Sequence, residues 1–144
     1  MLMSNYKTFI EAIESSKKIA SFDFDNTLVT HQGEPIWEVI ETLLDYSKQG
    51  YKIVIVTARH KHEGAEIDHL VDMHELPVEE VHFTSNEMKG PLLKSIGADV
   101  HIDDDHGQLR SAEDHGIEAI HTLLVLANKN EHYEILKAYL HRHL

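Results

Sequence analysis

The hydrophobic positions along this chain alternate between short continuous runs and runs at helical spacing. Continuous apolar runs of four to eight residues are typical of buried β-strands, whereas apolar residues three and four positions apart are typical of one helix face. Strands that alternate with helices favour a parallel sheet covered on both faces. The five strands that this pattern predicts are residues 19–24, 51–56, 81–83, 100–102 and 117–121.

The helical spacing, and the residues that begin and end each predicted helix, complete this pattern. Proline favours the first turn of a helix and glycine the position after its end, so Pro91 and Gly97 bracket one predicted helix. We expect one α/β domain over residues 1–144, a three-layer, doubly wound, five-stranded parallel sheet with extra N- and C-terminal helices. The predicted helices cover residues 3–13, 36–47, 67–74, 91–96 and 133–140.

The composition excludes several classes of protein. Hydrophobic residues make up 42% of the chain and charged residues 26%, as in ordinary globular domains. No apolar run approaches the roughly 18 residues of a membrane-spanning helix, and Glu11 and Glu14 interrupt the N-terminal segment where a secretory signal would be continuously apolar. The absence of cysteine excludes disulfides and thiolate chemistry. These features predict a cytoplasmic protein without a membrane partner.

The net charge is strongly negative. Asp and Glu number 25 against 13 Lys and Arg, which gives a formal charge of −12 with histidine neutral. Non-specific binding to nucleic acid depends on Lys and Arg that neutralise phosphates, so this balance argues against it. A nucleic-acid partner is disfavoured without being excluded, because a local basic patch could still form. The sequence leaves an oligomer open.

Polar residues follow the predicted strands, where parallel α/β sheets bind their ligands. The first strand leads into Asp23 and Asp25, two carboxylates whose mutual repulsion raises a pKa or recruits a cation. Thr57 follows the second strand, Lys89 follows the third, and residues 103–105 (three aspartates) follow the fourth. Each piece alone is explained by a solvated turn, a helix cap or a surface lysine. Together, at successive strand ends, they predict an active site.

In this order the motifs resemble those of the haloacid dehalogenase (HAD) superfamily. The segment Asp23-Phe24-Asp25-Asn26-Thr27 is similar to the DxDxT signature of that superfamily. Thr57 resembles the Thr or Ser of its second motif, Lys89 the lysine of its third, and Asp103-Asp104 its acidic fourth motif in the paired form. The resemblance covers about residues 19–121. It is greatest to short members without a cap domain, including the phosphatase part of polynucleotide kinases.

The resemblance implies a phosphatase that forms an aspartyl-phosphate intermediate on Asp23. Asp25 would protonate the leaving oxygen and later deprotonate the attacking water. To hold that proton, Asp25 needs nearby negative charge, which neighbouring carboxylates would supply. Thr57 and Asn26 would bind the phosphoryl group, and Lys89 would offset its charge. Family members that perform dehalogenation lack this second acid, so Asp25 favours phosphoryl transfer to water or to another acceptor.

The resemblance also implies a metal site with oxygen ligands, which favour Mg²⁺ over zinc. The ligands would be the Asp23 carboxylate, the Asp25 backbone carbonyl and a carboxylate from the end of the fourth strand. The alignment of this segment with the family motif favours Asp104 as the direct ligand and leaves Asp103 as the alternative.

Neighbouring side chains leave further alternatives open. Lys94 is the alternative motif lysine, but Lys89 begins its helix and so faces the strand ends. Arg59 and Lys61 follow the second strand and are candidates to hold a second phosphate or an anionic part of the leaving group. A solvated helix start is the slightly favoured explanation of these two residues. Trp37 is expected to pack in the core, with a stacking role as the less favoured alternative.

The spacing of the motifs leaves no room for a cap domain, which needs about 50 residues or more. The stretches 29–56 and 57–89 are each filled by a predicted helix and strand, and residues 29–35 remain as a short hairpin flap. We therefore expect an open site. The leading hypothesis is a Mg²⁺-dependent phosphatase for a small phosphorylated metabolite or nucleotide. The alternatives are a polynucleotide end-phosphatase and a non-catalytic phosphate-binding module.

Overall fold

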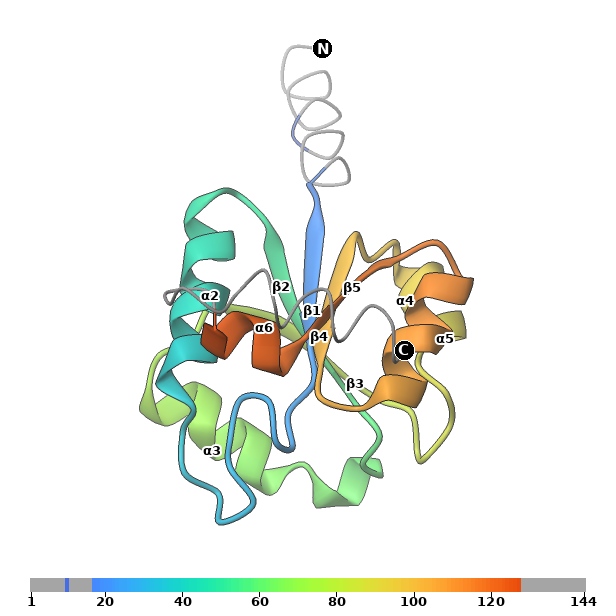
Figure 1. The fold of residues 1–144 in the computed structure, drawn as a ribbon. Coiled ribbons are helices and arrows are strands. Elements are labelled where there is room, and N and C mark those ends of the chain that lie inside the picture. Colours follow the sequence, from blue (N-terminus) through green and yellow to red (C-terminus); the bar gives the residue numbers. More distant parts are fainter. Residues whose placement is uncertain (1–9, 11–16, 128–144) are drawn as a thin grey trace, which may run out of the picture.

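The computed structural model describes residue 10 and residues 17–127, which form a parallel sheet between two layers of helices (Figure 1). Strands and helices alternate through most of this part of the chain, as the hydrophobic pattern predicts. The elements are β1 Ile19–Phe22, α2 Trp37–Lys48, β2 Lys52–Thr57, the 3₁₀ turn η1 Lys61–Glu63, α3 Ala65–Met73, β3 Val78–Phe83, α4 Gly90–Ile96, β4 Val100–Asp103, α5 His106–Asp114, β5 Glu118–His121 and α6 Thr122–Ala127.

The sheet has the strand order β3-β2-β1-β4-β5, and every pair of neighbouring strands is parallel. The chain builds outward from β1 through β2 to β3 and then returns to the other side of β1 with β4. This reversal lies where Ser21 pairs with His101 and Phe22 with Ile102. In doubly wound sheets the ligand crevice opens at the carboxyl ends of the strands beside such a reversal. The predicted fold class is confirmed.

The two faces of the sheet bury two separate cores. Helices α2 and α3 cover one face, while α4 and α5 cover the other (Figure 1). Along β2, Ile53 and Ile55 belong to the first core, and Val54 and Val56 belong to the second. Successive side chains of a strand point to opposite faces, so a strand covered on both sides reads as one unbroken apolar run.

The structure contains short elements that the pattern did not predict. Helix α5 is mostly polar, with Leu109 and Ala112 as its fully buried apolar residues, so its hydrophobic signal is weak. Strand β3 begins at Val78 rather than residue 81. The apolar pattern missed its first half, because Glu79 and Glu80 are exposed there. Helix α6 directly follows β5. The helices predicted at 3–13 and 133–140 lie outside the described residues, apart from residue 10.

The connection from β1 to α2 is a short hairpin flap rather than a cap domain. Val29 forms bridges with Asp25 and with Pro35, which close this flap. Within residues 17–127 no cap domain interrupts the sheet and its helices. The same part of the chain contains no helix with the length and apolar character needed to cross a membrane.

One core prediction is wrong. Trp37, expected to pack in the interior, begins α2 and is 54% exposed. Its ring contacts His74 edge-on, with 5.1 Å between ring centroids and an interplanar angle of 85°. Helix α2 buries Val39, Ile40 and Leu43 instead, so the periodicity of the helix directs Trp37 away from the core.

Candidate active site

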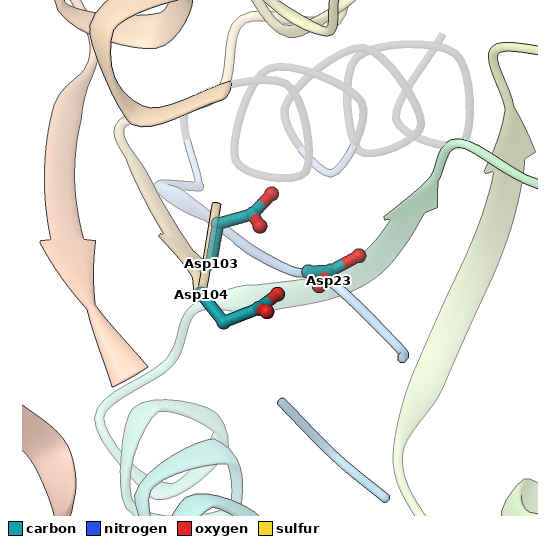
Figure 2. A group of neighbouring side chains, drawn as sticks. All are labelled: Asp23, Asp103 and Asp104. Carbon is teal, nitrogen blue, oxygen red and sulfur yellow. The ribbon is translucent and has the colours of Figure 1, made fainter. Parts of the chain in front are cut away.

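Three carboxylates converge at the carboxyl ends of the two strands that flank the reversal. Asp23 follows β1, Asp103 ends β4, and Asp104 follows it. One oxygen atom from each lies within 4.8 Å of the others. Asp23 and Asp103 are buried, and Asp104 is half-buried. In Figure 2 the Asp104 side chain points toward Asp23. Residues 80 positions apart in the sequence therefore form one acidic cluster.

Lys89 lies inside this cluster. Its Nζ donates hydrogen bonds to Asp23 Oδ1 at 2.8 Å and to Asp103 Oδ2 at 2.7 Å, and the residue is only 1% exposed. Its backbone N–H donates to Gln108 Oε1 of α5 at 2.8 Å, which fixes the start of α4. Lys94, the alternative motif lysine, is exposed on α4. The structure thus brings Lys89, rather than Lys94, to the predicted site.

Asp103 accepts three hydrogen bonds. Besides Lys89, His101 Nε2 lies 2.7 Å from its Oδ2, and the Asp105 backbone N–H donates to its Oδ1 at 3.0 Å. Burial alone would raise the pKa of Asp103, but the hydrogen bond from His101 and the charge of Lys89 hold it well below its usual value. Asp103 is therefore a carboxylate whose two oxygens are already engaged.

His101 is fully buried and bridges Asp103 to β1. Its Nδ1 lies 2.9 Å from Ser21 Oγ, and burial lowers the pKa of its imidazole. A neutral imidazole has a single N–H, and an ionised carboxylate only accepts. The proton therefore resides on Nε2 toward Asp103, and the Ser21 hydroxyl donates to Nδ1. This chain of hydrogen bonds holds the Asp103 side chain in place.

The local charge balance is negative. Burial would lower the pKa of Lys89, but Asp23 and Asp103 raise it above its ordinary value, so the ammonium stays charged. Burial raises the pKa of Asp23 despite the opposing charge of Lys89, and burial also raises the pKa of Asp104. One ammonium faces three carboxylates, so a further cation would stabilise their ionised forms.

The donor set of this cluster fits Mg²⁺. It consists of carboxylate oxygens from Asp23, Asp103 and Asp104, and hard divalent cations prefer oxygen ligands. Because Asp103 is held by His101, Lys89 and the backbone of Asp105, Asp104 is the fourth-motif carboxylate better placed to reach a metal beside Asp23. The structure supports a metal-binding cluster at this position.

Asp25 is paired with a guanidinium. Arg59 Nε donates to Asp25 Oδ2 at 2.9 Å and Arg59 Nη2 to Asp25 Oδ1 at 2.8 Å, a bidentate geometry. The hydrogen bonds with Asp25 raise the pKa of Arg59. The Arg59 guanidinium also lies 5.2 Å from the Phe24 ring centroid and 3.4 Å from Glu66 Oε1. We expected carboxylates near Asp25, and it does line one hollow with Asp23 and Asp104, but its direct partner is the Arg59 cation.

The other predicted site residues lie at different depths. Asn26 adopts a left-handed conformation with φ of 60° and lines a hollow of about 200 Å³ with Asp23, Asp25 and Lys89. Thr57 is buried beneath this edge, and its Oγ1 accepts a hydrogen bond from the Arg59 backbone at 3.2 Å. The predicted phosphate contacts of Asn26 and Thr57 stay predictions.

Lys61 is exposed at the start of η1, whereas Arg59 is engaged by Asp25 and Glu66. The role predicted for this pair, in holding a second phosphate, stays a prediction. The geometry leaves Lys61 without a direct place in the hollow that Asp23 lines.

The structure adds supporting residues that the sequence reasoning missed. His101 was overlooked, although a histidine inside an apolar strand, two positions before Asp103 and so on the same face, is a usable signal. Thr27 Oγ1 donates to Asp23 Oδ2 at 3.1 Å and lies 3.1 Å from Thr122 Oγ1. Nothing in the local sequence indicated a role for Thr122, which begins α6 directly after β5.

Comparisons with known proteins agree with this fold. Residues 20–143 match the family model described as haloacid dehalogenase-like hydrolase. Two solved structures of the Pnkp1/Rnl/Hen1 complex, one described as an RNA repair complex, are similar at TM-scores of 0.63 and 0.61 and at 12% and 14% identity. The alignments cover 73% and 74% of this chain but 42% and 46% of those chains, so this chain spans less than half their length. No curated protein matches the sequence.

Proposed function

Because this chain belongs to the haloacid dehalogenase-like hydrolases, we propose that it is a Mg²⁺-dependent phosphatase for a small phosphorylated metabolite or nucleotide. The observation that carries the proposal is the Lys89 ammonium between Asp23 and Asp103, with Asp104 beside them. This arrangement supports the proposal, because Asp23 as the proposed nucleophile lies beside a buried positive charge and candidate metal ligands. Mg²⁺ bound there would neutralise charge on the phosphate ester and on the attacking carboxylate.

In this proposal Asp23 attacks phosphorus and forms an aspartyl-phosphate, and the leaving oxygen departs as the P–O bond breaks. Thr27 and Lys89 each donate a hydrogen bond to the Asp23 carboxylate and so fix its direction. Lys89 also lies where its charge can stabilise the negative charge on the transferring group. Asp103 serves mainly to hold Lys89 in place, and Asp104 supplies a ligand oxygen.

Asp25 is the proposed general acid and base. It gives a proton to the leaving oxygen and later takes one from the water that hydrolyses the aspartyl-phosphate. In the structure its carboxylate is held by Arg59. A carboxylate has about four lone-pair sites, so in this proposal the leaving oxygen meets Asp25 while Arg59 keeps that side chain oriented.

The observations favour this function over the two alternatives. A polynucleotide end-phosphatase would need cations along its rim, but Arg59 is paired with Asp25 and Glu66. A non-catalytic phosphate-binding module would have no use for Asp25 as an acid. Both alternatives predict low turnover on small phosphate esters, which separates them from the proposed function.

The test is phosphate release from para-nitrophenyl phosphate and from a panel of phosphorylated metabolites, with and without Mg²⁺. We expect Mg²⁺-dependent release that Asp23→Asn reduces to background, while Asp45→Asn, which removes an exposed carboxylate from α2, leaves it unchanged. Full activity in Asp23→Asn would remove that residue from the nucleophile role. Metal-dependent phosphate binding without turnover on any ester would favour the binding module.

A further inference from the structure

An apolar hollow of about 560 Å³ lies between the flap and α3. Its lining includes Phe24, Pro35, Trp37, Leu70, Met73 and His74. Its volume falls within the range of small-molecule sites, about 300–1,000 Å³. Trp37 is 54% exposed and Met73 62% exposed, so two large apolar side chains meet solvent here. In Figure 1 the flap and α3 lie below the sheet, at the end where the strands terminate.

This hollow is connected to the acidic cluster through shared side chains. Asp25 lines the hollow that contains Asp23, and it also lines a second one with Arg59 and Glu66. Glu66 in turn lines both this second hollow and the apolar one with Trp37. The three hollows therefore form a path that leads from Asp23, past Asp25, to Trp37.

The proposed chemistry gives this path a direction. A general acid must lie beside the oxygen that departs, so the leaving group extends from the phosphate toward Asp25. Beyond Asp25 the path continues past Glu66 to Trp37. The leaving group of a bound ester thus lies on the side of the apolar hollow, not on the side of α5.

The side chains along the path indicate which leaving group fits. The indole of Trp37 offers an exposed aromatic surface, held edge-on by His74, and such rings stack on planar heterocycles. The Glu66 side chain is 67% exposed and accepts hydrogen bonds. Because Asp25 neutralises Arg59, the path favours an amino group over a second phosphate.

We propose that this hollow binds the leaving group of the substrate, and that this group carries a planar amino-bearing heteroaromatic ring, as in a nucleoside monophosphate. The proposal rests on the phosphatase function proposed above. It adds a substrate class, with Trp37 as the stacking residue and Glu66 as an acceptor for the amino group.

Trp37 is the single tryptophan of the chain, so its fluorescence reports directly on the hollow. The Asp23→Asn variant, titrated with adenosine 5′-monophosphate in the presence of Mg²⁺, should show saturable quenching, whereas glycerol 3-phosphate should leave the emission unchanged. No quenching by the nucleotide would overturn the proposal. A change in emission that follows protein concentration instead would assign the hollow to a second copy of the chain and would also overturn it.

Steady-state kinetics in the background that retains Asp23 separate this inference from the phosphatase function. Trp37→Ala should raise KM for adenosine 5′-monophosphate about tenfold, as loss of one base-stacking contact predicts, with glycerol 3-phosphate hydrolysis unchanged. Leu126→Ala, at another exposed apolar residue on α6, is the matched control. If Trp37→Ala and the wild type hydrolyse both esters with the same KM, the proposed binding of the leaving group in this hollow is refuted, while the phosphatase function stands. Quenching without turnover of any ester refutes the phosphatase instead.

Discussion

At the scale of single residues, three consecutive aspartates have three different surroundings. Asp103 accepts from Lys89, His101 and the Asp105 backbone. Asp104 joins the cluster with Asp23. Asp105 caps α5, with its Oδ1 accepting from the Gly107 and Gln108 backbones at 2.7 Å and 3.2 Å. Identical side chains therefore take different roles, because the chain turns from strand to helix over these positions.

The bidentate contact between Arg59 and Asp25 yields the first residue-scale prediction. In Arg59→Met, Asp25 loses the two hydrogen bonds that orient it, and we expect kcat to fall on the order of 10- to 100-fold. The free energy of unfolding should change by less than about 1 kcal/mol, because the pair is partly exposed. Lys52→Met, which breaks the Lys52–Glu80 ion pair of 2.6 Å, is the matched control. Steady-state kinetics and urea denaturation measure both effects, and an unchanged kcat would contradict the orienting role.

The buried imidazole of His101 yields a prediction of pH dependence. Burial lowers its pKa from the ordinary value of 6.5, so below that pH the unfolded chain binds a proton that the folded chain does not. The free energy of unfolding should therefore fall as the pH drops below about 6.5, by up to about 1.4 kcal/mol per pH unit for this group. Burial of His121 adds in the same direction.

The slope of stability against pH in EDTA, from urea denaturation between pH 7.5 and pH 5.5, is the measurement. His101→Gln removes one of the two groups, so its slope should be shallower than that of the wild type while His121 keeps part of it. A variant with the full wild-type slope would show that His101 is not responsible.

At the scale of elements, the site depends on how α4 docks against α5. The Gly90 backbone N–H donates to Ser111 Oγ at 3.0 Å. A Cβ atom at Gly90 would collide with the Ser111 carbonyl oxygen and with His115. This close approach places Lys89 at the start of α4, where it reaches Asp23. The position of the motif lysine therefore depends on a contact between two helices.

The two glycines that border α4 give a contrasting pair of variants. Gly90→Ala should displace the start of the helix, lower the free energy of unfolding by about 1–3 kcal/mol and reduce kcat. Gly97→Ala has free space around it but a φ of 74°, so it should cost about 1–2 kcal/mol of stability with kcat retained. Thermal unfolding and phosphate release measure the pair. Equal kcat in both variants would contradict the docking argument.

At the scale of the whole molecule, three carboxylates of low exposure meet where β1 and β4 end. The chain has a formal charge of −12, and the cluster of Asp23, Asp103 and Asp104 contains one compensating ammonium among the described residues. Burial of these carboxylates near one another opposes folding. A bound divalent cation should therefore stabilise the entire fold.

We expect Mg²⁺ to raise Tm, and EDTA to reverse the effect. At a Mg²⁺ concentration about 100 times its Kd the gain in unfolding free energy is about 2.7 kcal/mol. Asp104→Asn should abolish the shift. Asp105→Asn, which removes a neighbouring charge but keeps a helix-capping side chain, should retain it. Differential scanning calorimetry with each variant measures the shift, and a full Mg²⁺ response in Asp104→Asn would exclude that carboxylate as a ligand.

The sequence by itself determined the sheet, the order of its elements and the edge that carries the acidic residues. These follow from local information, because apolar runs and helical spacing depend only on which face each residue presents. The motif spacing also predicted Asp23 just after the first strand and Lys89 at the start of the helix that follows the third, where the structure has them. Helix α5, with its sparse apolar face, was the main element that this information did not reveal.

Only the tertiary structure decided which partner each charged side chain has. Lys89 meets Asp23 across 66 positions of sequence, and Arg59 meets Asp25 across 34. Trp37 was expected inside but is exposed, because Val39, Ile40 and Leu43 already fill the buried face of α2. Such partnerships depend on side-chain direction and on the packing between elements, and neither is contained in the spacing of residues along the chain.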